Sequence, residues 1–82
     1  MKLSELINKE ILSAGDILSI IQQVGENKDA ILVKNDRIRE ENQYTVVIIL
    51  SRKMEKSFRC DDGSLAKAMK IVLKEYVKEY NL

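Results

Sequence analysis

The chain lacks several residue types on which common functions depend. Its 82 residues include no histidine, no proline and no tryptophan, and only one cysteine and three glycines. Without histidine it has neither the commonest general acid or base nor the commonest transition-metal ligand, and Ser-His-Asp or Cys-His nucleophiles are excluded. One cysteine allows no intramolecular disulfide and no multi-cysteine metal site. The isolated glycines at 15, 25 and 63 cannot form a glycine-rich phosphate loop. We therefore expect a protein that is not an enzyme and uses no cofactor and no metal.

Long hydrophobic runs are also missing. Glu5 and Lys9 interrupt the N-terminal segment, so no signal peptide fits, and no segment approaches the roughly 18 apolar residues of a membrane span. The 45% hydrophobic and 33% charged content is typical of a folded domain, and the net charge of +1 gives no general attraction to nucleic acid or membrane. These features predict a single cytoplasmic domain over residues 1–82.

The most informative segment that is present spans residues 44–52. If it is extended, its side chains alternate between two faces, and both faces are apolar. One face carries Tyr44, Val46, Ile48 and Leu50, and the other carries Thr45, Val47 and Ile49. A strand of this kind needs cover on both faces. The rest of the chain can cover only one, so we expect a partner on the other.

Helical spacing of apolar residues occurs on both sides of this strand. Residues 3–24 predict either one helix kinked at Gly15 or two short helices stacked end to end, the second starting at the Ser13–Asp16 capping box. Gly25 is the expected stop. Residues 65–80 predict a second amphipathic helix.

Two further strands complete the predicted sheet. The first, residues 30–33, either ends there or continues with a bulge or turn to Ile38 and Arg39, and a polar turn follows at residues 40–43. The last strand, residues 56–60, follows a tight reversal at 53–55. The predicted fold is α+β, in the order helix-β-β-β-helix. Its three-stranded antiparallel sheet has residues 44–50 at the centre and both helices packed on one face.

Basic residues form the clearest polar pattern. Four lysines of the second helix recur every three or four residues, and four further cations flank the second hairpin. These candidate nucleic-acid contacts are Lys67, Lys70, Lys74, Lys78, Arg52, Lys53, Lys56 and Arg59. They could contact phosphates, or the lysines could simply be the solvated side of a helix. No aromatic residue is interleaved for base stacking.

The predicted order of elements is similar to that of double-stranded-RNA-binding domains. Residues 64–70, Ser-Leu-Ala-Lys-Ala-Met-Lys, resemble the start of the last helix in that family, which presents lysines to RNA. The family's strand loop contains proline and histidine, which this chain lacks, and its paired lysines at the helix start are also missing. The resemblance is therefore one of topology.

Three other sites, two pairs of residues and one single residue, are candidates with an ordinary alternative. Asp61 and Asp62 could bind a divalent cation, but a cap for the following helix is favoured. Cys60 could be a reactive thiol, but alternation with Phe58 favours the core. Tyr76 and Tyr80 suit an interface and the edge of a core equally well.

The preferred interpretation is a small binding protein that docks onto another protein or onto itself as a homodimer. The predicted interface residues are Val47, Ile49, Tyr76 and Tyr80. With ten lysines and ten isoleucines, the composition is typical of a phage or mobile-element inhibitor or accessory protein. The alternatives are a nucleic-acid-binding module and a subunit of a larger complex.

Overall fold

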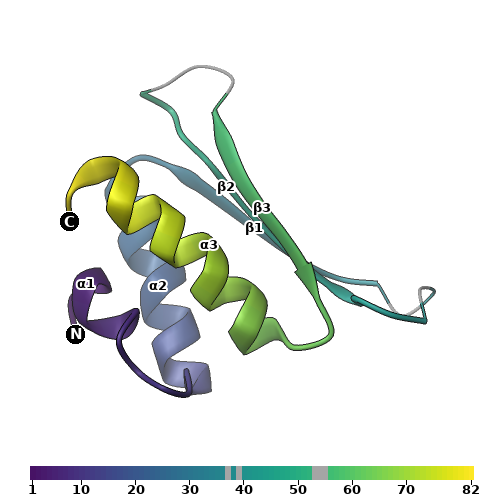
Figure 1. Cartoon of the computed structure of the whole chain (residues 1–82). Coiled ribbons are helices and arrows are strands. Elements are labelled where there is room, and N and C mark those ends of the chain that lie inside the picture. The colour runs from purple at the N-terminus through teal and green to yellow at the C-terminus, as the bar shows by residue number, and fades with distance from the viewer. Residues whose placement is uncertain (37, 39, 53–55) are drawn as a thin grey trace.

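The sheet is antiparallel, with three strands in the order β1-β2-β3. A computed structural model (Figure 1) describes residues 1–36, 38, 40–52 and 56–82. The strands are β1 (Ala30–Asn35), β2 (Tyr44–Ile49) and β3 (Ser57–Asp62). The most apolar strand, β2, is central, which confirms the prediction. Ile48 lies between Ile31 and Phe58 in the register, and Val47 lies between Leu32 and Arg59.

The N-terminal helical segment is divided. Helix α1 (Leu3–Leu6) is separated from α2 (Ala14–Glu26), and α1 lies beside α2 instead of stacking on its end (Figure 1). The capping box explains where α2 begins, because Ser13 Oγ accepts from Asp16 N at 3.1 Å and Asp16 Oδ2 accepts from Ser13 N at 2.9 Å. Lys9 Nζ adds a third contact to Asp16 Oδ2 at 2.6 Å.

Gly25 is not the stop of this helix. It lies inside the last turn of α2, and the chain reverses two residues after the helix, at Lys28, whose φ of 69° is in the left-handed region.

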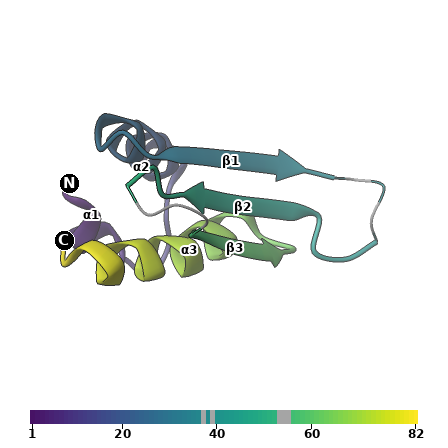
Figure 2. The same ribbon diagram turned by 90° about the horizontal axis from the view of Figure 1, so that it is seen from above.

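Helices α2 and α3 (Leu65–Tyr80) pack on one face of the sheet, as predicted (Figures 1 and 2). Helix α3 packs on β2 and β3, whereas α2 contacts β1 near the start of that strand. The core between the layers consists of apolar side chains from the helices and the inner face of β2. Its fully buried large members are Tyr76, Leu6, Ile20, Ile48, Met69, Leu73, Val24, Val46 and Val72.

Some predicted boundaries change. Strand β1 continues to Asn35 and ends there, Ile38 lies in a turn, and Arg39 is outside the described residues. Strand β3 includes Asp61 and Asp62, so neither is the N-cap of α3, but Asp62 Oδ1 accepts from the backbone N–H of the N-cap residue Ser64 at 2.9 Å. Ser64 is the N-cap, and its Oγ accepts from Lys67 N at 3.4 Å. The predicted reversal at 53–55 is also outside the described residues.

Candidate functional site

The sheet face that points away from the helices is the first candidate. Strand alternation and register place on it Ala30, Leu32, Lys34, Thr45, Val47, Ile49, Ser57, Arg59 and Asp61. Leu32 is 56% exposed and Ile49 42% exposed, while Val47 is half-buried. Leu32 lies directly opposite Val47 across the β1–β2 pair, and Ala30 lies opposite Ile49. These four side chains form one apolar patch, which we call the open-face patch.

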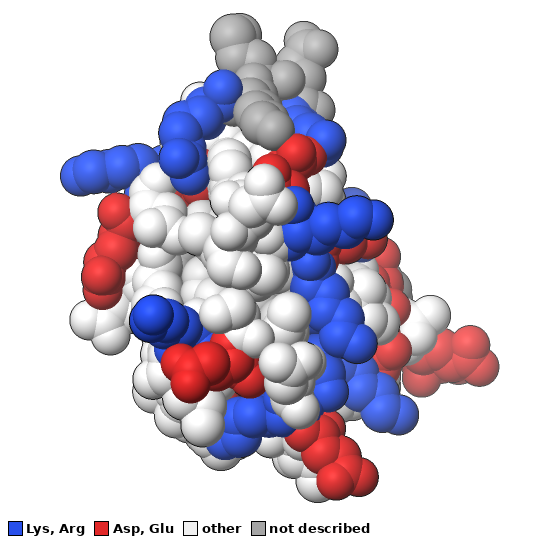
Figure 3. Space-filling view, turned by 60° about the vertical axis from the view of Figure 1, so that its left-hand side comes forward, with Lys and Arg blue, Asp and Glu red and all other residues white. Residues whose placement is uncertain are grey.

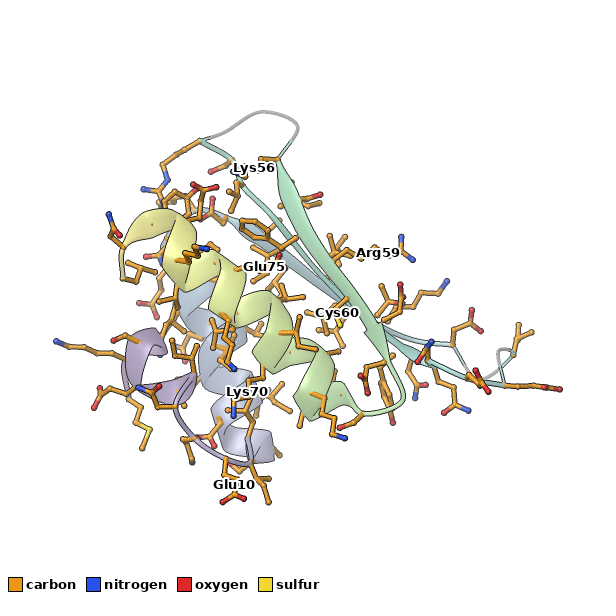
Figure 4. The ribbon with its side chains drawn as sticks, viewed as in Figure 1. Glu10, Lys56, Arg59, Cys60, Lys70 and Glu75 are labelled. Carbon is orange, nitrogen blue, oxygen red and sulfur yellow. The ribbon has the colours of Figure 1, made fainter. Side chains whose placement is uncertain are left out.

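A polar region adjoins the open-face patch. Thr45 Oγ1 donates a hydrogen bond to Asp61, and Arg59 Nε donates to Asp61 Oδ2 at 3.3 Å. Arg59 points away from the helical layer (Figure 4). A shallow hollow of about 300 Å³ joins the two regions, lined by Leu32, Lys34, Asp36, Thr45, Val47 and Arg59. The face therefore has an apolar part bordered by charged side chains.

The four predicted interface residues lie in different places and differ in burial. Val47 and Ile49 lie on the open face, as the alternation predicted. Tyr80 is half-buried at the end of α3. Tyr76 is fully buried, so its prediction as an interface residue is wrong: its ring fills the core between α3 and the sheet.

Sequence reasoning missed a buried polar cluster around Asp29. The Asp29 carboxylate, at a residue only 6% exposed, accepts from the Tyr76 hydroxyl at 2.7 Å and from Ser51 N at 2.9 Å. Asn27 Nδ2 donates to the Tyr76 hydroxyl at 3.1 Å. The only signal in the sequence is an aspartate directly before an apolar strand. Its partners lie 22 and 47 residues away, so local pattern could not find them.

These contacts determine the ionisation of the cluster. Burial by itself raises the pKa of Asp29, but the hydrogen bonds from Tyr76 and Ser51 and the nearby Arg52 outweigh it, and the pKa lies below its ordinary value. Burial and the hydrogen bond to Asp29 raise the pKa of Tyr76 to about 12. At neutral pH the cluster is therefore a carboxylate held by a neutral phenol, and it joins the start of β1 to α3.

Arg52 belongs to the same cluster. Its Nη2 lies 3.5 Å from Asp29 Oδ2, and its guanidinium lies 4.1 Å from the centre of the Tyr80 ring. Tyr80 in turn meets Tyr76 edge-on, with ring centres 5.3 Å apart. Arg52 therefore packs against an aromatic ring and a buried carboxylate, an arrangement typical of a structural role.

Three of the other seven predicted phosphate contacts have protein partners. Lys56 Nζ pairs with Glu79, Arg59 pairs with Asp61, and Lys70 Nζ donates to the backbone carbonyl of Lys9. Lys53 lies outside the described residues. The remaining predicted contacts are the exposed Lys67, Lys74 and Lys78. On the face of the molecule that Figure 3 shows, basic side chains form a column with acidic side chains beside it.

Cys60 lies on the helix-facing side of β3, packed against the core (Figure 4). Burial raises the pKa of its thiol, and the carboxylates of Asp62, Asp61 and Glu75 raise it further. A thiol with a raised pKa is mostly protonated at neutral pH and is a weak nucleophile. Cys60 is therefore best understood as a packing residue.

Within residues 1–36, 38, 40–52 and 56–82, no three His, Cys, Asp or Glu side chains are placed to share a metal ion. None of the helices in this part of the chain is long and apolar enough to cross a membrane. No protein-family model, curated protein or solved structure matches the chain.

Proposed function

We propose that this chain is a non-catalytic protein-binding domain that docks through its open-face patch. The observation that supports this proposal is the exposure of Leu32 on β1 and Ile49 on β2, which share the sheet face that points away from the helices. Covering an exposed aliphatic side chain of this size stabilises a complex by roughly 1.5–3 kcal/mol. Contiguous exposed apolar side chains rimmed by polar ones are typical of association surfaces.

Charged residues beside the open-face patch would make its binding specific. Lys34, Asp36, Arg59 and Asp61 border the apolar side chains on the side of Leu32 and Val47 with both signs of charge. Charges at a rim contribute little affinity, but they select the partner and its orientation. We extend the proposal to an inhibitor or accessory role in the cytoplasm, exerted on another protein, as a separate molecule or as a subunit of a complex.

The test compares two double variants of the full chain in affinity capture from extracts of the source cells. Leu32→Lys with Ile49→Lys adds two charges to the open-face patch. Leu18→Lys with Ile71→Lys is the matched control, because these residues are 68% and 46% exposed on α2 and α3. We expect the wild type and the control to retain the same protein, and the open-face variant to retain at least tenfold less, with unchanged thermal unfolding.

Two results would contradict the proposal. One is equal retention by the open-face variant and the wild type. The other is unfolding of the open-face variant, because side chains that are exposed in the isolated chain can accept a charge without loss of structure.

A further inference from the structure

The outer edge of β1 presents backbone N–H and C=O groups that are separate from the side chains of the open-face patch. Asp36 N donates to the Gln43 carbonyl at 2.6 Å, which continues the β1–β2 register by one hydrogen-bonded pair. Alternate pairs of an antiparallel ladder exchange hydrogen bonds. Residues 30, 32 and 34 therefore bond β2, and the N–H and C=O groups of Ile31, Val33 and Asn35 point to the opposite side. Within the described chain, no strand lies on that side of β1.

This edge has few of the features that normally prevent pairing. Edge strands are usually short, charged, bulged or covered. β1 has six residues, its register with β2 is continuous, and its first four residues are Ala-Ile-Leu-Val. Leu32 is 56% exposed on the open face, and Val33 is 42% exposed on the helix-facing side, because α2 covers only the start of the strand. Beyond that start, no described element runs along the outer side of β1 (Figure 2).

The other edge of the sheet is protected. Leu50 N donates to the Lys56 carbonyl, which sets the alternation of the β2–β3 ladder. The positions of β3 that point outward are therefore Ser57, Arg59 and Asp61, of which two are charged and paired with each other. An incoming strand at this edge would therefore pair with three positions of β3, two of which carry a charged side chain.

We propose that β1 pairs antiparallel with β1 of a second copy of this chain, joining the two sheets into one sheet of six strands. The outward backbone groups at 31, 33 and 35 are placed symmetrically about Val33. A two-fold axis at Val33 therefore lets every outward N–H of these residues reach a carbonyl of the other copy. In this register the two Val33 side chains meet on the helix-facing side. Each Leu32 lies beside the alkyl stem of Lys34 of the second copy.

The size of the open face supports a second copy as the occupant. Six residues per strand and three strands give a face of roughly 20 by 14 Å, or about 280 Å² in projection. A stable protein interface buries about 800 Å² on each partner. Pairing at β1 doubles the width of the open face and brings the two open-face patches together. This inference rests on the proposed function, since it supplies that function with a larger docking surface.

The test uses proline at matched positions of the two edges. Val33→Pro removes an outward N–H of β1 without removing a bond to β2, and Arg59→Pro does the same at β3. The molar mass of the full chain is measured by light scattering over a concentration series up to that of NMR samples. We expect wild type and Arg59→Pro to rise from 9.4 kDa toward twice that mass, and Val33→Pro to remain at 9.4 kDa.

Amide hydrogen exchange gives a second measurement, which decides the matter even if a proline variant does not fold. In the wild type, we expect the amides of Ile31, Val33 and Asn35 to slow by at least tenfold as concentration rises. The amides of Leu32 and Lys34, which bond β2, should be slow at every concentration.

Several outcomes would overturn the pairing of β1. These are a wild type that stays at 9.4 kDa, a dimer whose three outward amides exchange rapidly, and protection of those amides by a different protein. A dimer broken by Leu32→Lys with Ile49→Lys but not by Val33→Pro would indicate face-to-face packing, which overturns the edge proposal and keeps the proposed function. A dimer that pairs through β1 but retains no other protein would keep the edge proposal and overturn the proposed function.

Discussion

The two outer strands of the sheet differ in a way that their composition does not suggest. Both pair with β2 over six residues, yet β1, which begins Ala-Ile-Leu-Val, is exposed at every position except the half-buried Ile31. β3 contains an arginine and two aspartates and is half-buried at four of its six positions. The long helix α3 lies along β3 and β2, while α2 reaches only the start of β1. The arrangement covers the polar strand and leaves the apolar one uncovered.

This comparison shows that helix placement, more than hydrophobicity, decides which strand is buried. An apolar strand left exposed while a polar one is covered is unfavourable for an isolated domain, since burial of aliphatic groups is the main stabilising force. It is favourable for a domain that completes its structure by binding. Substitutions at matched positions of β1 and β3 should therefore destabilise the fold to different extents.

The largest expected effect is at the anchor of β1. Asp29→Ala removes the acceptor of hydrogen bonds from Tyr76 and Ser51 and leaves a buried phenol with one partner fewer. We expect a loss of about 3 kcal/mol in the free energy of unfolding, because hydrogen bonds to charged groups contribute about 1.5–3 kcal/mol each. Urea unfolding followed by circular dichroism measures it.

The matched change on β3 is Asp61→Ala. Asp61 is more exposed than Asp29, and its partners include Thr45 and Arg59 on the open face. A loss of about 1 kcal/mol is expected, since solvent replaces these contacts. Equal losses for the two variants would mean that Asp29 is not a special anchor.

The next effect compares two residues that flank Ile48 in the register. Phe58 on β3 and Ile31 on β1 both face the helices and are half-buried. We expect Phe58→Ala to lower the free energy of unfolding by about 2 kcal/mol and Ile31→Ala by about 1 kcal/mol, less than for fully buried side chains. Calorimetry at low concentration measures both. A larger loss at Ile31 would show that β1 is held as firmly as β3.

The pH dependence tests the Asp29 anchor in another way. Because the pKa of Asp29 in the folded chain is below its ordinary value of 3.8, the unfolded chain binds more protons in acid. The stabilisation is complete above about pH 4 and is lost as the pH falls through the folded value. We therefore expect the difference in unfolding free energy between the wild type and Asp29→Asn to shrink in acid.

A control for that experiment is available in α2. The pKa of Asp16 is lowered to about 2 by the hydrogen bond from Lys9 and the contact with Ser13 N. Introducing Asp16→Asn into both the wild type and the Asp29→Asn variant removes this second acid-sensitive group. A difference between wild type and Asp29→Asn that is constant with pH in this background would contradict the assignment to Asp29.

The smallest expected effect concerns the exposed lysines of α3. Replacing Lys67, Lys74 and Lys78 by Gln should change the free energy of unfolding by less than about 0.5 kcal/mol. If these lysines bind phosphate, wild-type affinity for duplex DNA falls with salt at a slope near −0.9 per contact, and the triple variant loses binding. We expect no binding to DNA or RNA at about 50 mM salt, where phosphate contacts are strong. Salt-dependent retention of the wild type would favour the nucleic-acid alternative.

The sequence predicts much of this fold because the relevant signals are local. The helical repeat of residues 65–80 matches the bounds of α3, and the two apolar faces of residues 44–50 correctly identify the central strand. The Ser13–Asp16 capping box marks the start of α2. In each case, side-chain spacing or a contact three residues away carries the information.

The parts that could not be predicted depend on contacts between distant residues. From the sequence, Tyr76 fits an interface and the edge of a core equally well. Its hydrogen bond to the distant Asp29 accompanies its place in the core. Arg52 reads as a surface cation until Tyr80 is placed against its guanidinium. The sequence indicates that one face of β2 lacks cover, but not that α2 stops short and leaves β1 exposed as well.

The methyl groups that become covered when the protein binds identify its binding surface most directly. A neutral paramagnetic probe in solution broadens the NMR signals of exposed methyl groups. In the isolated chain at low concentration, we expect strong broadening at Leu32 and Ile49 and little at the buried Ile48. On addition of the captured partner, Leu32 and Ile49 should become protected while Leu18 and Ile71 stay exposed. Protection of Leu18 and Ile71 with no change at Leu32 and Ile49 would contradict the claim that the open face is the binding surface.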